Sequence, residues 1–347
     1  MFEEYIEKIK NKQNLSYEEM SDGMSELFSG KTSDIQNLEF LSSLTAKGET
    51  DDELLGMLDK MNEFSLKIHL KDKENTIDMC GTGGDGLSTF NISTAASFVV
   101  ASCGGKVAKH GNRSSGISGS ADIFEYFGYD LDSEPSQIEK ILDTHNICFI
   151  FAQKFHPAMK KVANARKQFG KRTAFNLLGP LSNPAGVKNQ MIGVFSSEYL
   201  ERLPNLLLKR GAKNIMTVRS DDGLDEFSTS SSNRICLTKN NKILMNSINP
   251  EVIGLHKSKL EEIQINSKKD AINSFIGVLN NTANQSMIET TALNAAGGLI
   301  VANKAKNFDD ALEMSLNSIK EQKAFNLFKE FVEDTGDIQK IREITNG

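Results

Sequence analysis

The chain has 347 residues, of which 39% are hydrophobic and 25% charged, and its formal net charge is −6. This length predicts two domains with a sizeable core. The acidic balance argues against a dedicated binder of nucleic acid or of a membrane surface, although a local basic pocket can still receive phosphates. The composition therefore favours small-molecule partners, with no nucleic acid and no membrane among them.

Cysteine usage and the amino-terminal segment indicate the compartment. The four cysteines lie far apart and form no CxxC pair, which favours thiols in a reducing cytosol over a disulfide framework or a zinc site. The segment MFEEYIEKIK lacks a cationic stretch followed by an apolar one. No run approaches the roughly 20 apolar residues that a membrane span needs. We expect a cytoplasmic protein.

The first 70 residues predict a helical domain. Three segments begin with the Ser/Thr-x-x-Glu/Gln spacing of a capping box, at residues 16–19, 33–36 and 50–53. Apolar residues then recur at helical spacing, for example at Ile35, Leu38, Leu41 and Leu44. This spacing predicts that each helix buries one face.

From residue 76 the pattern changes to short apolar runs that alternate with helical segments. The runs are CFIFA at 148–152, QMIGVF at 190–195 and NIMTV at 214–218. This alternation predicts βαβ units and a parallel sheet. After about residue 267 helical patterning dominates again, and we expect these helices to pack on the sheet domain. The predicted domains are 1–70, helical, which helices from elsewhere in the chain can join, and 71–347, α/β.

The stretch DMCGTGGDG at residues 78–86 contains four glycines. Such a cluster allows left-handed backbone angles or the close approach of another group. It lies between a predicted strand at 75–79 and a helix predicted from Ser93, and N–H groups in such a loop form an anion site for which phosphate is the natural ligand. The cluster is neither GxGxxG nor GxxxxGK[ST]. Taken alone, it leaves a tight turn as an equal alternative.

A second stretch, KHGNRSSGISGSAD at 109–122, follows another strand candidate and leads into the helical segment ADIFEYFG. Lys109 and Arg113 supply positive charge, while Asn112 and the serines supply directional donors for a phosphate. A solvated loop is the alternative.

A third stretch, RSDDGLDEFS at 219–228, places Asp221, Asp222, Asp225 and Glu226 within six residues. Clustered carboxylates repel one another unless a cation or water intervenes. Oxygen ligands of this kind suit Mg²⁺, which binds through one or two carboxylates together with substrate phosphates. A solvated acidic turn is the alternative.

With these three stretches the chain resembles the anthranilate phosphoribosyltransferase family. The resemblance covers most of residues 75–230, in order: GTGGDGLSTFNIST at 81–94, KHGNR and SGSAD within 109–122, FHPAMK through NLLGPLSNP within 155–184, and DGLDE at 222–226. It implies an α/β fold with a separate all-helical domain, that is, a nucleoside phosphorylase/phosphoribosyltransferase-like two-domain fold with a central mainly parallel sheet. It also implies a homodimer through the helical domain and a ligand in the cleft between domains.

The family resemblance implies a reaction as well. The phosphoribosyl group of 5-phosphoribosyl 1-pyrophosphate (PRPP) passes to anthranilate, giving N-(5-phosphoribosyl)anthranilate and pyrophosphate in tryptophan biosynthesis, with Mg²⁺ as cofactor. The aromatic amine of anthranilate is neutral at physiological pH, so no strong general base is required. The barrier lies in the departure of pyrophosphate, which Mg²⁺, Lys109 and loop N–H groups are expected to stabilise.

The same resemblance assigns residues to each ligand. To PRPP it assigns Gly81, Gly84, Asp85, Thr89, Asn91, Ser93, Thr94, Lys109 and Ser120. To magnesium it assigns Ser93, Asp225 and Glu226, and to anthranilate Gly81, Asn112 and Arg166. Lys109 and Asn112 are the predicted catalytic residues. Arg166 suits its role because a guanidinium can meet a carboxylate through paired hydrogen bonds.

The chain departs from the family pattern at two places. Two alternative functions also have their own sequence features. The loop from Ser114 to Ser118 is one residue shorter than usual, and Arg219–Ser220 replaces the usual His-Gly. A pyrimidine nucleoside phosphorylase would carry KHSTGG in place of the glycine cluster and a longer C-terminal domain. A non-catalytic, family-like nucleic-acid-binding protein would show a basic surface and eroded magnesium residues.

Overall fold

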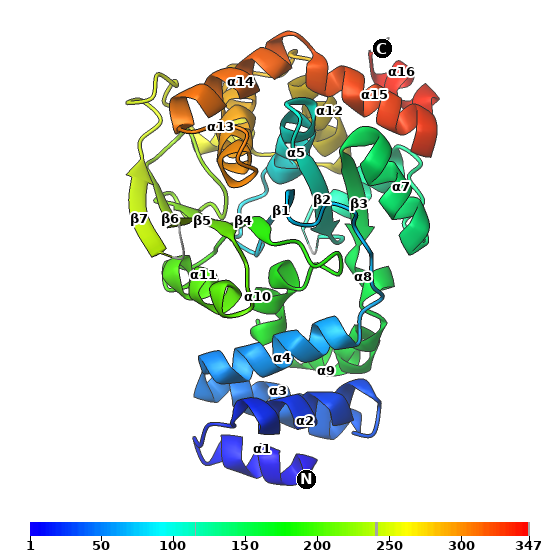
Figure 1. The fold of residues 1–347 in the computed structure, drawn as a ribbon, viewed down its shortest axis with the longest axis vertical. Coiled ribbons are helices and arrows are strands. Elements are labelled where there is room, and N and C mark those ends of the chain that lie inside the picture. The colour runs from blue at the N-terminus through cyan, green and yellow to red at the C-terminus, as the bar shows by residue number, and fades with distance from the viewer. Residues whose placement is uncertain (115, 240–241, 346–347) are drawn as a thin grey trace. The chain divides into compact units, whose positions relative to one another are not determined.

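The structure is a computed structural model that describes residues 1–114, 116–239 and 242–345. It divides into two compact units, each with its own core (Figure 1). The helical unit contains residues 1–67 and 152–184, and the α/β unit contains residues 68–151 and those from 185 onward. Within the described ranges, no helix has the length and apolar character needed to cross a membrane.

The helical unit confirms the three predicted capping boxes. The side chains of Ser16, Ser33 and Thr50 each accept a hydrogen bond from the backbone N–H three residues later, and the Glu or Gln there accepts one in return. The helices of this unit are α1 (Phe2–Lys10), α2 (Tyr17–Phe28), α3 (Asp34–Lys47), α4 (Asp51–Glu63), α8 (Ala152–Phe155), the 3₁₀ helix η1 (Pro157–Val162), α9 (Ala163–Phe169) and α10 (Ala174–Leu181).

The predicted apolar face of α3 is correct at Leu41 and Leu44 but wrong at Ile35, which is 77% exposed. The buried face passes through Asn37 instead. Its carboxamide accepts a hydrogen bond from the Thr32 hydroxyl at 2.6 Å and donates one to a carbonyl of η1 at 3.2 Å. A satisfied amide can occupy a core position, so hydrophobicity alone chose Ile35 in the first turn where Asn37 is buried.

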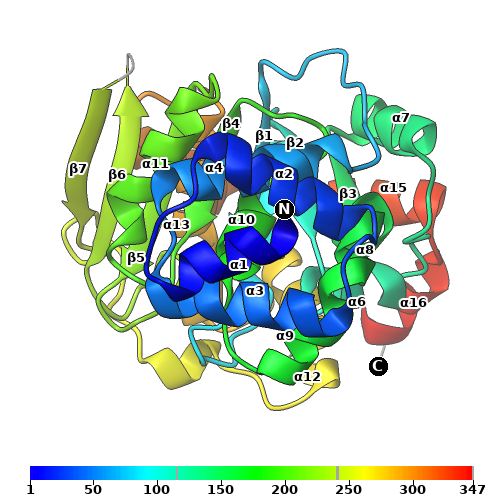
Figure 2. The same cartoon turned by 90° about the horizontal axis from the view of Figure 1, so that it is seen from below.

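Within the described residues, seven strands form one sheet in the order β3-β2-β1-β4-β5-β6-β7. Strands β1 to β5 run parallel, which confirms the predicted sheet, and β6 and β7 add an antiparallel hairpin that the sequence did not predict. Figure 2 shows this hairpin at the edge away from β3. The strands are β1 (Thr76–Gly81), β2 (Lys106–Gly111), β3 (Ile147–Phe151), β4 (Asn189–Gly193), β5 (Asn214–Ser220), β6 (Asn233–Lys239) and β7 (Lys242–Ile248).

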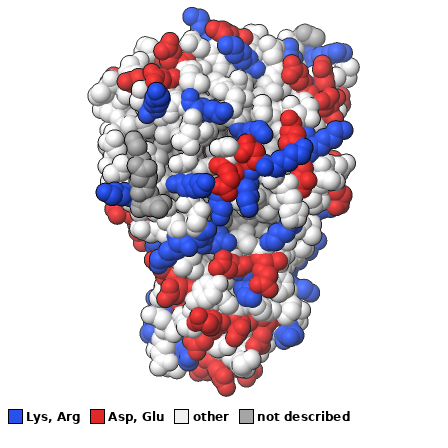
Figure 3. All heavy atoms as spheres, viewed as in Figure 1, with Lys and Arg blue, Asp and Glu red and all other residues white. Residues whose placement is uncertain are grey.

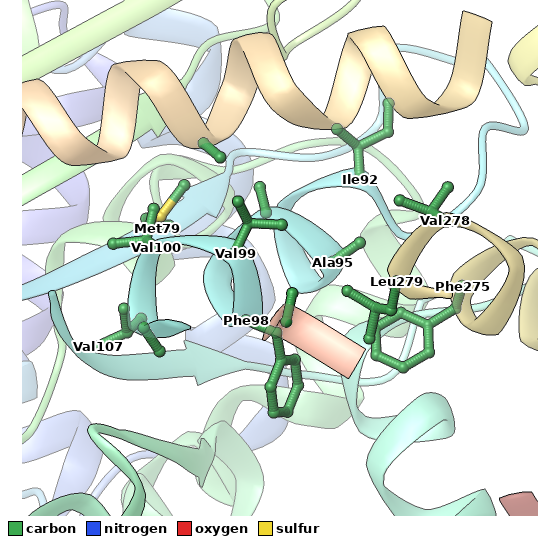
Figure 4. Packing of buried hydrophobic residues seen from close by; sticks show 14 of the residues in the cluster. Met79, Ile92, Ala95, Phe98, Val99, Val100, Val107, Phe275, Val278 and Leu279 are labelled. Atoms are coloured by element: carbon green, nitrogen blue, oxygen red, sulfur yellow. The ribbon is translucent and has the colours of Figure 1, made fainter. Parts of the chain in front are cut away.

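Helix α5 (Ile92–Ser102) lies at the centre of the α/β core. Nine of its eleven residues are buried, and it contacts β1, β2 and β3 as well as α12, α13, α14 and α15. Figure 4 shows its packing, with Ile92, Ala95, Phe98, Val99 and Val100 of α5, Met79 and Val107 of the strands, and Phe275, Val278 and Leu279 of α12. The C-terminal helices therefore pack on the sheet domain, as predicted.

The other helices cover both sides of the sheet. Helix α13 contacts β1, β4 and β5, and α11 contacts β5, β6 and β7 from the opposite side (Figure 1). The helices of this unit, besides α5, are α6 (Ser120–Tyr126), α7 (Pro135–His145), α11 (Tyr199–Lys209), the 3₁₀ helix η2 (Leu260–Ile263), α12 (Lys268–Leu279), α13 (Gln285–Val301), α14 (Phe308–Lys320), α15 (Lys323–Thr335) and α16 (Ile338–Thr345).

The carboxyl ends of the parallel strands bring the three sequence motifs to one edge of the sheet. The glycine cluster follows β1, the KHGNR segment ends β2 and continues into the next loop, and the acidic turn follows β5. Strands β1, β2 and β4 all end in glycine, at Gly81, Gly111 and Gly193. Open α/β sheets bind ligands at this edge.

Candidate active site

The glycine cluster needs glycine for two reasons, left-handed backbone angles and the close approach of another group. Gly83, Gly84 and Gly86 have left-handed φ angles of 68°, 75° and 80°, where a side chain is strained. Gly81 does not, but a Cβ at that position would lie 2.7 Å from Oδ2 of Asp225. The N–H of Gly83 donates to the same oxygen at 2.6 Å. The loop is thus shaped both by its own angles and by the acidic turn that lies against it.

Helix α5 begins beside this loop. Its N-cap residue, Asn91, makes no side-chain capping bond to the helix. Its Oδ1 instead accepts a hydrogen bond from Ser118 Oγ at 3.1 Å, which ties the loop after β1 to the loop after β2. The first turn carries Ser93 and the buried Thr94. The N–H groups of a helix amino terminus attract anions, so the predicted phosphate residues share a suitable location.

Lys109, on β2, connects that strand with β1 and with α5. It is 1% exposed, and its Nζ donates to the carbonyl of Met79 at 2.7 Å and to Ser93 Oγ at 3.1 Å. Ser93 in turn stabilises the ionised carboxylate of Glu226. Burial lowers the pKa of Lys109, while the charge of Asp78, followed by those of Cys80 and Glu226, opposes this shift. The result is a continuous chain from Lys109 through Ser93 to Glu226.

Glu226 and Asp225 place two carboxylates at the end of this chain. Burial, followed by the charge of Asp225, raises the pKa of Glu226 to about 8, and Lys109 opposes the shift. The described residues contain no group of three or more His, Cys, Asp or Glu side chains that could hold a metal ion. Two carboxylates with the Ser93 hydroxyl nevertheless fit Mg²⁺, which completes its shell with waters and phosphate oxygens. The pKa of Glu226 is raised by its burial and by the neighbouring charge of Asp225, and a bound cation would offset both effects.

The other two acidic residues of the turn have partners within the protein. Asp221 accepts a hydrogen bond from Arg234 at 2.7 Å at the surface. Asp222 accepts hydrogen bonds from the hydroxyls of Ser228, at 2.6 Å, and Ser230. Burial opposes ionisation of Asp222, but these donors outweigh it and hold its pKa below the ordinary value. Asp222 therefore stabilises the turn, and it is not positioned as a ligand.

Two cations near the predicted site are likewise tied to the protein. Arg113 forms a bidentate pair with Glu125 at 2.5 and 2.6 Å, so it ties the loop after β2 to the last turn of α6. Arg219 donates to the carbonyls of Phe195 and Ser220, each at 3.2 Å, so it supports the end of β5. The shortened loop Ser114 to Ser118 includes residue 115, which lies outside the described residues.

The other residues that are predicted to bind PRPP lie along the loops after β1 and β2. Asp85 Oδ1 accepts from the N–H of Leu87 at 2.9 Å, which stabilises the glycine loop. Thr89 forms an isolated bridge with Gln264. Ser120 begins α6, and a Cβ at Gly111 would lie 2.1 Å from its Oγ. The carbonyl of Asn112 accepts from Ala121 N at 3.3 Å.

Arg166 lies in the helical unit, on α9. Its Cζ is 5.7 Å from the centroid of the Phe175 ring, within the range of a cation–π contact. Burial lowers its pKa, and no carboxylate among the described residues forms an ion pair with it. A half-buried guanidinium without an acidic partner is suited to receive the carboxylate of a ligand.

The structure thus brings Gly81, Ser93, Lys109, Asp225 and Glu226 together in the α/β unit. The sequence did not identify Gly193, where a Cβ would lie 1.5 Å from the carbonyl oxygen of Asp225. Its only signal was a glycine within an apolar run. In the sheet Gly193 pairs in register with Gly81, so the two glycines lie side by side beneath the acidic turn.

The surface gives no support to the nucleic-acid alternative on the face shown in Figure 3. Acidic and basic side chains are interspersed there, without a broad basic area. The acidic turn also retains the two carboxylates that such a protein would have lost.

Comparison with known proteins agrees with this geometry. The helical bundle domain of the glycosyl transferase family matches residues 3–65, and the a/b domain of the same family matches residues 73–325. The chain is 69% identical to anthranilate phosphoribosyltransferase of Nitrosopumilus maritimus (strain SCM1) over the whole of both chains.

Solved structures show the same fold. The crystal structure of anthranilate phosphoribosyltransferase from Thermus thermophilus has a TM-score of 0.88 and 31% identity, over 95% of this chain and 98% of that one. The Saccharomyces cerevisiae enzyme, in complex with PRPP and Mg, has a TM-score of 0.87 and 24% identity, over 96% of this chain and 97% of that one. The full-length identity and both family domains show that this chain belongs to the anthranilate phosphoribosyltransferase family.

Proposed function

We propose how this chain carries out the reaction of its family, the transfer of the phosphoribosyl group from PRPP to anthranilate. The observation that carries the proposal is the chain Lys109–Ser93–Glu226 beside Asp225, at the carboxyl edge of the sheet. This arrangement combines a buried cation, a helix amino terminus and two carboxylates around one loop. A pyrophosphate group with Mg²⁺ needs all three kinds of partner.

Departure of pyrophosphate is the step that these residues assist. The loop N–H groups and the start of α5 bind phosphate oxygens, and Lys109 supplies a fixed positive charge beneath them. Ser93, Asp225 and Glu226 would hold Mg²⁺, which when bound neutralises charge on the leaving group. Because these groups are already oriented, little reorganisation accompanies the growth of charge.

Anthranilate is recognised through its carboxylate. Arg166 binds that group, and Gly81 and Asn112 contact the rest of the molecule. The aromatic amine attacks ribose C1 without prior deprotonation, since it is neutral at physiological pH. Orientation of the amine, and not a strong base, supplies the remaining acceleration.

The enzyme acts as a homodimer through its helical unit, in the cytoplasm. Ile35 and Met1 of that unit are 77% and 75% exposed, and exposed apolar side chains mark association surfaces when they cluster. Sedimentation of the wild type and of Ile35→Glu tests this, because a monomeric wild type contradicts it.

One assay tests the reaction. Anthranilate fluorescence is followed with PRPP and Mg²⁺, beside a phosphorolysis reaction with thymidine and uridine. We expect fluorescence loss that requires both PRPP and Mg²⁺ and no phosphorolysis. Phosphorolysis without anthranilate consumption would instead establish the pyrimidine nucleoside phosphorylase alternative.

A further inference from the structure

The backbone of the acidic turn is held at a residue that no ligand is proposed to touch. Phe227 follows Glu226 directly and is fully buried. Its N–H donates to Oδ1 of Asn294 at 3.0 Å, and its carbonyl accepts from Nδ2 of Asn294 at 2.8 Å. A single carboxamide therefore satisfies both backbone groups of one residue, as a neighbouring strand would.

Asn294 is itself fixed. It lies on α13, is fully buried, and its Nδ2 also donates to the carbonyl of Thr290 one turn earlier at 2.9 Å. Both Nδ2 hydrogens and Oδ1 therefore have partners. The side chain cannot move without breaking several buried hydrogen bonds, each of which costs the desolvation penalty of the groups left unpaired.

The Phe227 ring is held against the same helix. A Cβ at Gly297 of α13 would lie 2.7 Å from Cε2 of Phe227, and the ring makes an edge contact with Phe308 at 5.8 Å between centroids. On the other side of the carboxylates, the carbonyl of Asp225 lies over Gly193. The segment 225–227 is thus fixed between the end of β4 and helix α13.

The contacts with α13 and β4 oppose the repulsion between the two carboxylates of the turn. Asp225 and Glu226 are adjacent carboxylates in a partly buried site, and they repel each other when both are ionised, as cation binding requires. A turn free to move would separate them and would have to be reassembled each time a cation bound. Fixing the following peptide removes that ordering cost from binding.

We propose that Asn294 is a positioning residue for the Mg²⁺ and pyrophosphate site, which holds Asp225 and Glu226 in their ligand-binding arrangement through the backbone of Phe227. The inference rests on the proposed function, since it assumes that these two carboxylates bind the cation. It assigns to α13 a role in the reaction although no residue of that helix is among the proposed ligand contacts.

The test compares Asn294→Ala with Asn189→Ala. Asn189 is also a buried carboxamide that bonds two backbone carbonyls, those of Glu74 and Thr76, at 2.8 and 3.3 Å, but it lies at the opposite end of β4. For Asn294→Ala, which loses both hydrogen bonds to Phe227, we expect the half-saturating Mg²⁺ concentration to rise at least about tenfold. Turnover at saturating Mg²⁺ should recover to within about threefold of the wild type.

Asn189→Ala should lower the melting temperature comparably and leave the Mg²⁺ dependence unchanged. An unchanged Mg²⁺ dependence in Asn294→Ala, or an equal change in both variants, would overturn the inference. The variant Asp225→Asn with Glu226→Gln separates this failure from that of the proposed function. If it too keeps the wild-type Mg²⁺ dependence, the metal site itself is wrong.

Hydrogen exchange on the wild-type protein gives a second test that does not depend on a variant folding. Without Mg²⁺ and pyrophosphate, the Phe227 amide should already exchange at least about a thousandfold more slowly than in an unstructured chain. Protection that appears only after Mg²⁺ and pyrophosphate are added would mean that the ligands order the turn, and would overturn the inference.

Discussion

Both halves of the acidic turn carry carboxylates, but the two halves differ in their hydrogen-bond donors and in the direction of their pKa shifts. Asp221 and Asp222 receive hydrogen bonds from Arg234 and from serine hydroxyls, and the pKa of Asp222 is lowered. Asp225 and Glu226 lie against the glycine loop and Ser93, and the pKa of Glu226 is raised. A charge that the protein satisfies supports the fold, whereas a charge left poorly satisfied is available to a ligand.

The largest effect should come from the second half of the turn. Asp225→Asn together with Glu226→Gln keeps the shape of the side chains but removes their charges. Activity should fall by on the order of a thousandfold, because several kcal/mol of transition-state stabilisation depend on the cation that these charges hold. Steady-state assays over a range of Mg²⁺ concentrations measure this. Near-normal turnover with unchanged Mg²⁺ dependence would make the whole turn a solvated surface.

Two arginines show the same contrast between a charge that is paired within the protein and one that is not. Arg234 is paired with Asp221, but Arg166 has no acidic partner among the described residues. Arg166→Ala should raise the KM for anthranilate roughly tenfold to a hundredfold, as expected for a lost hydrogen bond to a charged group, and change the KM for PRPP much less. Arg234→Ala is the matched control and should change neither. Equal effects of Arg166→Ala on both substrates would remove its proposed role.

The glycine loop that faces Asp225 should show a smaller effect. Gly84 has a φ of 75°, and an alanine there costs about 1–2 kcal/mol through backbone strain. Gly84→Ala, and Gly83→Ala beside it, should weaken PRPP binding by about tenfold or more, because both positions need left-handed angles and a strained loop would lose its phosphate-binding shape. Calorimetric titration with PRPP and Mg²⁺, alongside thermal melts, separates affinity from stability. Unchanged affinity in both variants would mean that the loop serves only as a turn.

The smallest effect should come from the first residue of the turn. Asp221 and Arg234 form an exposed pair, and such pairs contribute little because water screens them. Asp221→Ala should change the free energy of unfolding by less than about 0.5 kcal/mol and leave the Mg²⁺ dependence intact. Chemical denaturation and the standard assay check this. A loss of activity like that of the Asp225 and Glu226 variant would mean that the two halves of the turn have the same role.

Local patterns predicted much of the fold because their causes lie within a few residues. The capping boxes at Ser16, Ser33 and Thr50 need only a residue three positions later. The three motifs meet in the structure because parallel strands end at one edge of the sheet, and only the family resemblance linked them beforehand. The return of residues 152–184 to the helical unit depends on contacts distant in sequence, which a local pattern does not record.

The division of the acidic turn could not be predicted for the same reason. Asp222 accepts from Ser228 and Ser230 because the loop between β5 and β6 folds back on itself, which the spacing of the residues does not show. Glu226 depends on Ser93, more than a hundred residues earlier. The need for Gly193 arises from a close contact with Asp225 that exists only in the folded sheet.

The central claim, that the protein satisfies Asp222 but not Glu226, is tested most directly by thermal melts of the metal-free protein. The folded-state pKa of Glu226 is raised to about 8, so stability is lost as pH rises from about 4.5 through 8, the range between its unfolded and folded values. The pKa of Asp222 is lowered, so its contribution is present at high pH and lost only as pH falls below its ordinary value. At pH 8.5, Glu226→Gln should therefore raise the Tm by at least about 2 °C, and Asp222→Asn should lower it by a similar amount or more. Shifts of the same sign in the two variants would contradict the account.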